Sequence, residues 1–420
     1  MTAREPDSLR DDPAREKASA PLREKGVFAV GAALAVLCAV AVIVRAKIVY
    51  FTVGQENAGS EIDNLGLVIQ LSAMVVGVIA IHLASSRRAA MNVLIAEGIV
   101  CMACHGWHAA IYAGGVVLWY GLCSWPPLPR MLRVVLGLGV LVGMNALGFL
   151  GEELRAPAYL FSLIFTLRMI MFAWDRWQND FEPAAFRDYV IYMAPAPLVV
   201  MPPYFLIIPV FSGFNDRFEH GLTRAKVRRI VRHLGWAALF GGMRAAVDPT
   251  GIDHNLFGHL VAGVMVAGAY AHGYIALLLV HGIDERLPLV RPLLATRFVD
   301  YWSRYQVHQK DAQMFLFFTP ALLKLRRKNR YFAIAMATTW TMLVGNTFLH
   351  VATRYCFMPG LYERVRWLMV INIVMAAALA VEMCIDEYRR RARKPSSKPT
   401  RPVIAARWAI TMCLAAIAAT

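Results

Sequence analysis

The side chain best placed to do chemistry in this sequence is His350, a single histidine inside the apolar segment 341–354 (TMLVGNTFLHVATR). An ionisable side chain at membrane depth is costly, so such a residue indicates a functional site. Histidine titrates near neutral pH, and burial without a counter-charge keeps it neutral, which suits a general base. Asn346 lies four residues earlier, so on a helix it faces the same side and can orient the ring or a substrate.

A polar and aromatic block precedes this histidine: residues 298–320 read FVDYWSRYQVHQKDAQMFLFFTP. The spacing of Phe298, Tyr301 and Tyr305 places three rings on one helical face. We expect residues 283–329 to form a cytoplasmic-side helical segment that lies at the interface or re-enters the protein. An amphipathic interfacial loop without a chemical role is the alternative.

The composition is that of a membrane protein. Of the 420 residues, 58% are hydrophobic and 17% are charged, whereas soluble domains carry about 25% charged residues. Apolar runs of about 20 residues recur along the chain, each long enough to cross a bilayer. Continuous runs favour helices over a barrel. We therefore expect an all-α, polytopic transmembrane protein with about 10 to 12 spans. The candidate spans are residues 27–46, 65–84, 92–123 (one tilted helix or two short ones), 131–151, 157–174, 188–211, 234–248, 255–282, 330–353, 363–385 and 403–420.

The net charge of +16 sits in short connections between these spans. The basic connections are Arg87 with Arg88, residues 224–232, residues 324–330 and residues 389–401. This pattern is typical of cytoplasmic loops, which also meet anionic lipid headgroups. No recognition motif accompanies the charge, so we expect no nucleic-acid partner. Residues 1–26 are expected to be a disordered cytoplasmic tail, followed by one transmembrane domain over 27–420.

The order and spacing of the motifs resemble those of the membrane-bound O-acyltransferase (MBOAT) family over roughly residues 180–355. Residues 301–308 (YWSRYQVH) resemble the bacterial block F-W-R-R-W-H-I-S, and Pro320 follows at the family's spacing. The basic run 324–330 comes next, and residues 345–350 (GNTFLH) are similar to the family's turn ending in a shared histidine. Upstream, residues 186–205 (FRDYVIYMAPAPLVVMPPYF) are similar to its aromatic, proline-rich span.

The resemblance implies a bacterial inner-membrane enzyme that moves an acyl group from acyl-CoA or an acyl carrier protein to a hydroxyl of a polysaccharide, lipid or small metabolite. It implies no metal and no cofactor beyond the acyl donor, with membrane lipids as surroundings. Gln306 stands where the family usually has His, Asn or Asp, and glutamine cannot usefully accept a proton. His350 is therefore expected to act as the general base alone. His308, two residues after Gln306, is the candidate to replace the second polar residue of the family's site. The same departure also fits an inactive relative.

The site residues implied by the resemblance fall into two groups. The catalytic group is His350, Gln306, His308 and Asn346, and the substrate-binding group is Trp302, Arg304, Tyr305 and Phe348. Arg304 suits a phosphate of coenzyme A or an acidic carrier-protein surface, because guanidinium pairs well with such groups. A basic residue of a cytoplasmic loop is the competing interpretation.

Two other function classes remain open. A transporter or flippase would use His350 and the region of Glu97 as a proton or substrate path, without covalent chemistry. A membrane redox protein would use Cys101-Met102-Ala103-Cys104-His105, which has the C-x-x-C-H pattern of covalent haem attachment. That string lies in an apolar stretch, where a short pattern also arises by chance.

Overall fold

The computed structural model describes residues 36, 64–104, 107–124, 128–146, 165–178, 184–197, 211, 214, 217–219, 221–247, 256–305, 307–353, 361–392 and 401–419. Within these ranges the regular elements are helices, and Phe218 and Ile283 form one isolated antiparallel bridge. The expected all-α class is confirmed. The expected tail 1–26 lies outside the described residues, as does the span 27–46 apart from Val36.

The described helices overlap most of the predicted apolar runs, whereas parts of the predicted spans 131–151, 157–174 and 188–211 lie outside the described residues. In the first half they are α3 (Asn64–Leu83), α4 (Arg87–Ala103), α5 (Trp107–Ser124), α6 (Arg130–Ala146), α8 (Leu167–Gln178) and α9 (Phe186–Met193). The second half has α11 (Arg224–Val247), α12 (Leu256–Val280), α13 (Phe298–Arg304), α14 (Val307–Gln313), α15 (Thr319–Lys324), α16 (Arg330–Trp340), α17 (Thr347–Thr353), α18 (Leu361–Arg391) and α19 (Arg401–Ala419). A 3-10 turn, η7 (Pro292–Leu294), and two π-helical turns, η8 (Met314–Phe318) and η9 (Thr341–Asn346), complete the set.

Two helical regions have limits that the predicted spans did not define. The long run 92–123 forms two helices, α4 and α5, and the Ser86 hydroxyl caps α4 by accepting a hydrogen bond from the Ala89 N–H at 3.2 Å. Helix α11 begins at Arg224 rather than at residue 234. Its first turns are basic, so the hydropathy of the sequence does not predict them as part of a span. In the structure Arg229, in these turns, forms an ion pair with Asp284 at 2.7 Å.

Three helical stretches are long and apolar enough to cross a membrane. They are Leu260–Val280 in α12, Arg330–Val351 in α16 to α17, and Tyr362–Arg391 in α18. Shorter apolar helices cover Val68–Leu83, Ala109–Ser124, Val135–Met144 and Pro402–Cys413. The described residues therefore have the character of an all-helical membrane protein with three candidate spans, and the larger span count stays a prediction.

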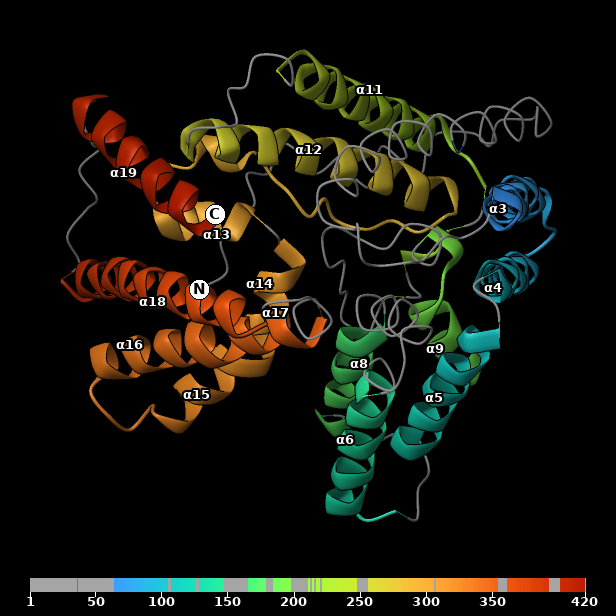
Figure 1. Ribbon diagram of the computed structural model, residues 1–420, viewed down its shortest axis with the longest axis horizontal. Coiled ribbons are helices and arrows are strands. Elements are labelled where there is room, and N and C mark those ends of the chain that lie inside the picture. Colours follow the sequence, from blue (N-terminus) through green and yellow to red (C-terminus); the bar gives the residue numbers. More distant parts are fainter. Residues whose placement is uncertain are drawn as a thin grey trace.

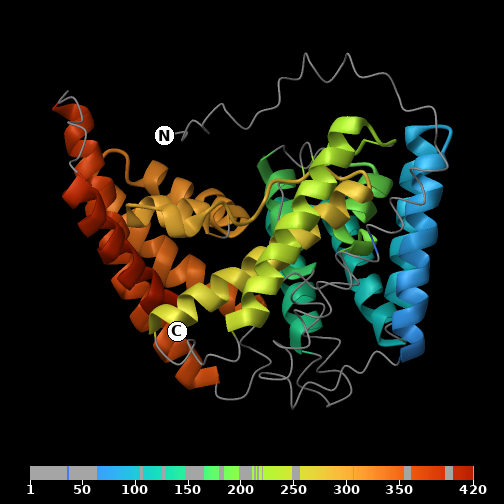
Figure 2. The ribbon, with the colours of Figure 1, turned by 90° about the horizontal axis from the view of Figure 1, so that it is seen from above.

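Helix α12 occupies the middle of the molecule. It runs beside α11, where the Nδ1 atoms of His233 and His272 lie 2.8 Å apart, and it also contacts α19 (Figure 1). Helices α5, α6, α8 and α9 gather on one side of it, and α13 to α19 lie on the other (Figures 1 and 2). The main apolar core includes α12 residues such as Leu277 and Leu279, both fully buried.

Helices α16 to α17 and α18 form an antiparallel hairpin. Thr338 on α16 contacts Met383 on α18 (Oγ1 to Sδ, 3.7 Å), and Asn346 farther along meets Asn372 (Nδ2 to Oδ1, 2.7 Å). At the start of α16, the Arg330 Nε lies 3.6 Å from a carboxylate oxygen of Glu387. Residues later in α16 and η9 therefore contact residues earlier in α18, as in an antiparallel pair.

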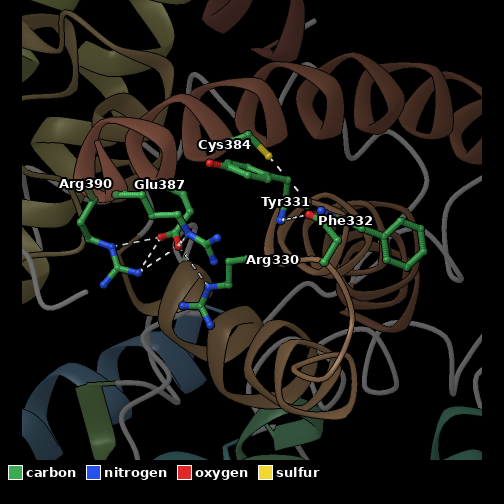
Figure 3. A network of polar contacts seen from close by, with 8 residues as sticks. Arg330, Tyr331, Phe332, Cys384, Glu387 and Arg390 are labelled. Atoms are coloured by element: carbon green, nitrogen blue, oxygen red, sulfur yellow. Dashed lines mark hydrogen bonds and ion pairs between the residues drawn. The ribbon is translucent and has the colours of Figure 1, made fainter. Parts of the chain in front are cut away.

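Ion pairs join the two helices at one end of this hairpin. Figure 3 shows Glu387 between Arg330 and Arg390, with Cys384 directed at the backbone carbonyl of Tyr331. Arg391 reaches the same carboxylate at 2.9 Å. Basic residues that the sequence assigns to two separate cytoplasmic loops therefore meet at one end of the hairpin.

Candidate active site

His350 lies at the end of a row of amide side chains. The Gln309 Nε2 is 3.5 Å from the His350 Nε2 and donates a hydrogen bond to the Asn346 Oδ1 at 3.0 Å. The Gln313 Nε2 donates to the same oxygen at 2.6 Å, and the Asn346 Nδ2 donates to the Asn372 Oδ1 at 2.7 Å. Residues from α14, η9, α17 and α18 thus converge on one point.

These amides are shielded from solvent. Gln309, Gln313, Asn346 and Asn372 are each at most 3% exposed. Buried polar groups are costly unless they are hydrogen-bonded, and the Asn372 Nδ2 finds its partner in the hydroxyl of Thr347 at 2.9 Å. The exception is the Gln313 Oε1, which is buried and has no hydrogen-bond partner among the described residues. An open acceptor inside an otherwise paired network is a feature that a ligand hydroxyl would satisfy.

The two π-helical turns bring the row together. Gln313 directly precedes η8, Asn346 ends η9, and the two turns contact each other. A Cβ at Gly345 would lie 2.8 Å from the ring of Phe317, so only glycine allows this approach. Isolated π turns occur often at functional sites, because they redirect side chains within a helix.

The contact with Gln309 indicates a protonation form for His350. An amide nitrogen can only donate a hydrogen bond, so the His350 Nε2 is placed to accept it. The contact is compatible with a lone pair on Nε2, the form of the His350 ring that a general base needs.

An apolar cluster lies beside the histidine turn. Leu349 packs with Ala312 of α14 and with Leu167 and Met171 of α8, and all four are at most 1% exposed. The polar row therefore has a dry hydrocarbon flank, formed by side chains from three helices.

The helper expected at Gln306 lies outside the described residues. Gln309, three residues later, is the side chain that meets His350. His308 makes its hydrogen bond elsewhere, from its ring to the Arg286 carbonyl at 3.0 Å, and lies 4.0 Å from Glu285. Burial lowers the pKa of His308, although Glu285 opposes this effect. The structure therefore places Asn346, but not His308, with His350.

The expected substrate-binding residues are spread out. The rings of Phe298, Tyr301 and Tyr305 stack with centroids 6.1 and 5.5 Å apart, which confirms their predicted common face. Trp302 packs against the main core. The carbonyl of Arg304 accepts the Val290 N–H at 2.8 Å.

Phe348 is 39% exposed and contacts Phe317, with ring centroids 6.3 Å apart.

Sequence reasoning missed three members of the row, although signals for them exist. Gln309 and Gln313 are four residues apart, so on a helix they share a face. Asn372 is a lone amide in the apolar run WLMVINIVMAAALAV, where a polar side chain marks a contact or a site.

A second buried polar pair lies away from this site. The His281 Nε2 is 2.8 Å from a carboxylate oxygen of Glu97, and both side chains are at most 1% exposed. The His281 Nδ1 bonds the carbonyl of Leu277 at 2.7 Å. Glu97, on α4, thus finds a partner at the end of α12.

The haem-like string does not present its thiols as attachment requires. Cys101 is fully buried on α4, where its backbone carbonyl accepts a hydrogen bond from Gln70 at 3.0 Å. The Cys104 thiol points to the carbonyl of Val100 on the same helix. Covalent haem attachment needs two accessible thiols, so this geometry argues against it.

Within the described ranges, no three His, Cys, Asp or Glu side chains gather as metal ligands do. The expectation that the chemistry needs no metal stays a prediction. The chain matches no protein-family model, and no curated protein matches it. The likeness to the MBOAT family therefore rests on the motifs alone.

Proposed function

We propose that this protein is an MBOAT-like membrane acyltransferase with His350 as its general base. The observation that carries the proposal is the buried row in which Gln309 links His350 to Asn346 within an apolar helical hairpin. Buried amides around one histidine are expensive in an apolar setting, and a proton-transfer site gives them a role. The apolar cluster at Leu349 gives the row a hydrocarbon neighbour, the chemical character that an acyl chain needs beside it.

The proposed reaction begins when an acceptor hydroxyl takes the place of Gln309 at the His350 Nε2. The nitrogen removes the hydroxyl proton while the oxygen attacks the thioester carbonyl carbon. The carbon–sulfur bond then breaks, and the thiolate leaves with the proton from His350. The amide N–H of Gln309 would stabilise the oxyanion that develops in between. The donor is acyl-CoA or an acyl carrier protein.

The proposed setting is a bacterial inner membrane crossed about 10 to 12 times, with the N-terminus in the cytoplasm. The meeting of Arg330 and Arg390 at Glu387 supports this orientation, because both lie in basic segments that are typical of cytoplasmic loops.

A deletion strain tests the proposal most directly. Mass spectrometry of its lipids, glycans and metabolites should find one acyl mass missing, restored by the wild-type chain and not by His350→Ala. Loss of a general base costs about 100- to 10,000-fold in rate. Restoration by His350→Ala would refute the assignment of the base. A complete set of acyl masses in the deletion strain would refute the reaction class.

The Glu97–His281 pair favours a second candidate, a proton-coupled transporter or flippase. A carboxylate and an imidazole in contact at full burial can share a proton, as membrane proton paths require. Flux of unmodified substrate into liposomes, lost in Glu97→Gln, would favour this function over acyl transfer.

A further inference from the structure

A basic hollow lies where helices α4 and α9 begin, away from the histidine row. Its volume is about 580 Å³, and its lining residues are Arg87, Arg88, Met91, Ala185, Phe186 and Arg187. Two segments almost a hundred residues apart in the sequence thus supply three arginines to one cavity.

Two of these arginines, Arg187 and Arg88, are only partly neutralised by the described residues. Among the described residues, Arg187 pairs with Asp188, whose Oδ1 lies 3.8 Å from the Arg187 Nε, and both side chains are about one-third exposed, so this ion pair is weak. The Nε of Arg187 is buried and has no hydrogen-bond partner among the described residues. Arg88 is exposed. Among the described residues that line the hollow, positive charge is therefore in excess.

Arg87 is held in position from behind. Its Nε donates to the carbonyl of Phe218 at 3.2 Å, and its guanidinium lies over the Phe218 ring at 5.9 Å. Phe218 in turn bridges to Ile283. A fixed guanidinium loses less entropy when it binds a ligand, so Arg87 is a prepared member of the cavity.

The chemistry of the lining defines the ligand. Guanidinium groups match phosphate oxygens in charge and geometry. The positive ends of α4 and α9 add to the same field. Phe186, which is 45% exposed, and Met91 give the hollow an apolar wall. We propose that this hollow binds the phosphate of an anionic membrane lipid, whose hydrocarbon part lies along Phe186.

The position of the hollow favours a lipid over a soluble phosphate compound. Arg87 and Arg88 belong to a connection with the charge pattern of a cytoplasmic loop, and Phe218 belongs to the loop before α11 with the same pattern. Anionic lipids are enriched in the membrane surface that such loops face. The inference does not depend on acyl transfer.

Native mass spectrometry of the detergent-purified full chain tests the proposal, with phosphatidylglycerol and phosphatidylcholine as competing probes. The wild type should retain phosphatidylglycerol in preference. Arg88→Gln with Arg187→Gln should weaken that retention about thirtyfold, since each arginine contributes about fivefold. The matched control, Arg228→Gln with Arg232→Gln, removes the same charge from the exposed face of α11 and should bind as the wild type does.

A charge-preserving variant and a competing soluble phosphate complete the test. Arg88→Lys with Arg187→Lys keeps the charge and should retain much of the binding, which also guards against a folding defect in the glutamine variant. Equal loss in the hollow and control variants would overturn the proposal in favour of general charge attraction. No preference for phosphatidylglycerol in the wild type, or displacement of the lipid by glycerol 3-phosphate at comparable concentration, would overturn the lipid assignment.

Discussion

Gln309 and His350 face each other across two helical segments, with their Nε2 atoms 3.5 Å apart. The distance is long for a hydrogen bond, whereas the contact from Gln309 to Asn346 is short, at 3.0 Å. A second donor or acceptor can therefore enter at the histidine without dismantling the row behind it. This relationship is the geometric basis of the proposed site.

Gln309→Ala should lower the rate of acyl transfer about 100-fold, because a misplaced catalytic group costs that much. The Michaelis constant for the donor should change little, since the residue acts at the reacting groups. Steady-state kinetics on the reconstituted protein measure both values. Gln306→Ala is the matched control, because the family resemblance assigns the helper role to Gln306. A large loss in Gln306→Ala and none in Gln309→Ala would contradict the assignment.

Asn372→Ala should destabilise the protein by about 1 kcal/mol, since it removes the partners of the Asn346 Nδ2 and the Thr347 Oγ1. The variant should also lose activity, because Asn346 is then free to turn. Thermal unfolding in detergent gives the first quantity. Ile373→Ala, at an exposed neighbouring position, should leave both nearly unchanged. Equal effects of the two substitutions would mean that the amide has no special role.

Gly345→Ala should destabilise the contact between the two π turns by about 1 to 3 kcal/mol, because the new methyl group overlaps the ring of Phe317. Adding Phe317→Ala should recover part of the loss, which a double-mutant cycle measures. Gly139→Ala on α6 serves as the control, since nothing lies within 4 Å of its added Cβ. An additive double mutant would show that the two residues do not touch.

Acid should destabilise the fold through His308. Burial lowers its pKa in the folded protein, whereas an unfolded histidine titrates near about 6.5. As the pH falls below that value, the unfolded chain takes up a proton that the folded chain does not. Stability therefore falls with decreasing pH, by at most about 1.4 kcal/mol per unit, until the folded pKa is reached.

The unfolding midpoint measured between about pH 7 and about pH 5 checks this slope. His308→Gln keeps a donor for the Arg286 carbonyl and should show a shallower dependence. The nearby charges of Glu285, Arg286 and Asp311 are unchanged in that variant. Parallel curves for the two proteins would exclude His308 as the source.

The helices could be predicted from the sequence, because long apolar runs leave a membrane-embedded backbone few alternatives. The polar start of α11 could not, since its basic residues interrupt the apolar pattern and its ion pair to Asp284 joins residues far apart in the chain. The π turns also escape prediction, because they rest on the contact between Gly345 and Phe317.

Within the site, the energetic cost of an ionisable side chain at membrane depth predicts His350, and the four-residue spacing predicts Asn346. The sequence motif points to Gln306, whereas the structure has Gln309 beside His350. The pairing of Glu97 with His281 has no local signature, because the partners are 184 residues apart.

The antiparallel hairpin has a consequence for where the two substrates come from. His350 lies about 30 Å along the helix from Arg330, which is roughly the thickness of the hydrocarbon layer. If the charged end at Glu387 marks the cytoplasmic surface, His350 lies toward the other side of the hydrocarbon layer, where Gln309 reaches it from the segment expected to enter from the cytoplasmic side. A thioester made inside the cell would then have to be threaded through the protein, while the hydroxyl could be supplied from outside. The enzyme would join two pools of molecules that the bilayer otherwise keeps apart.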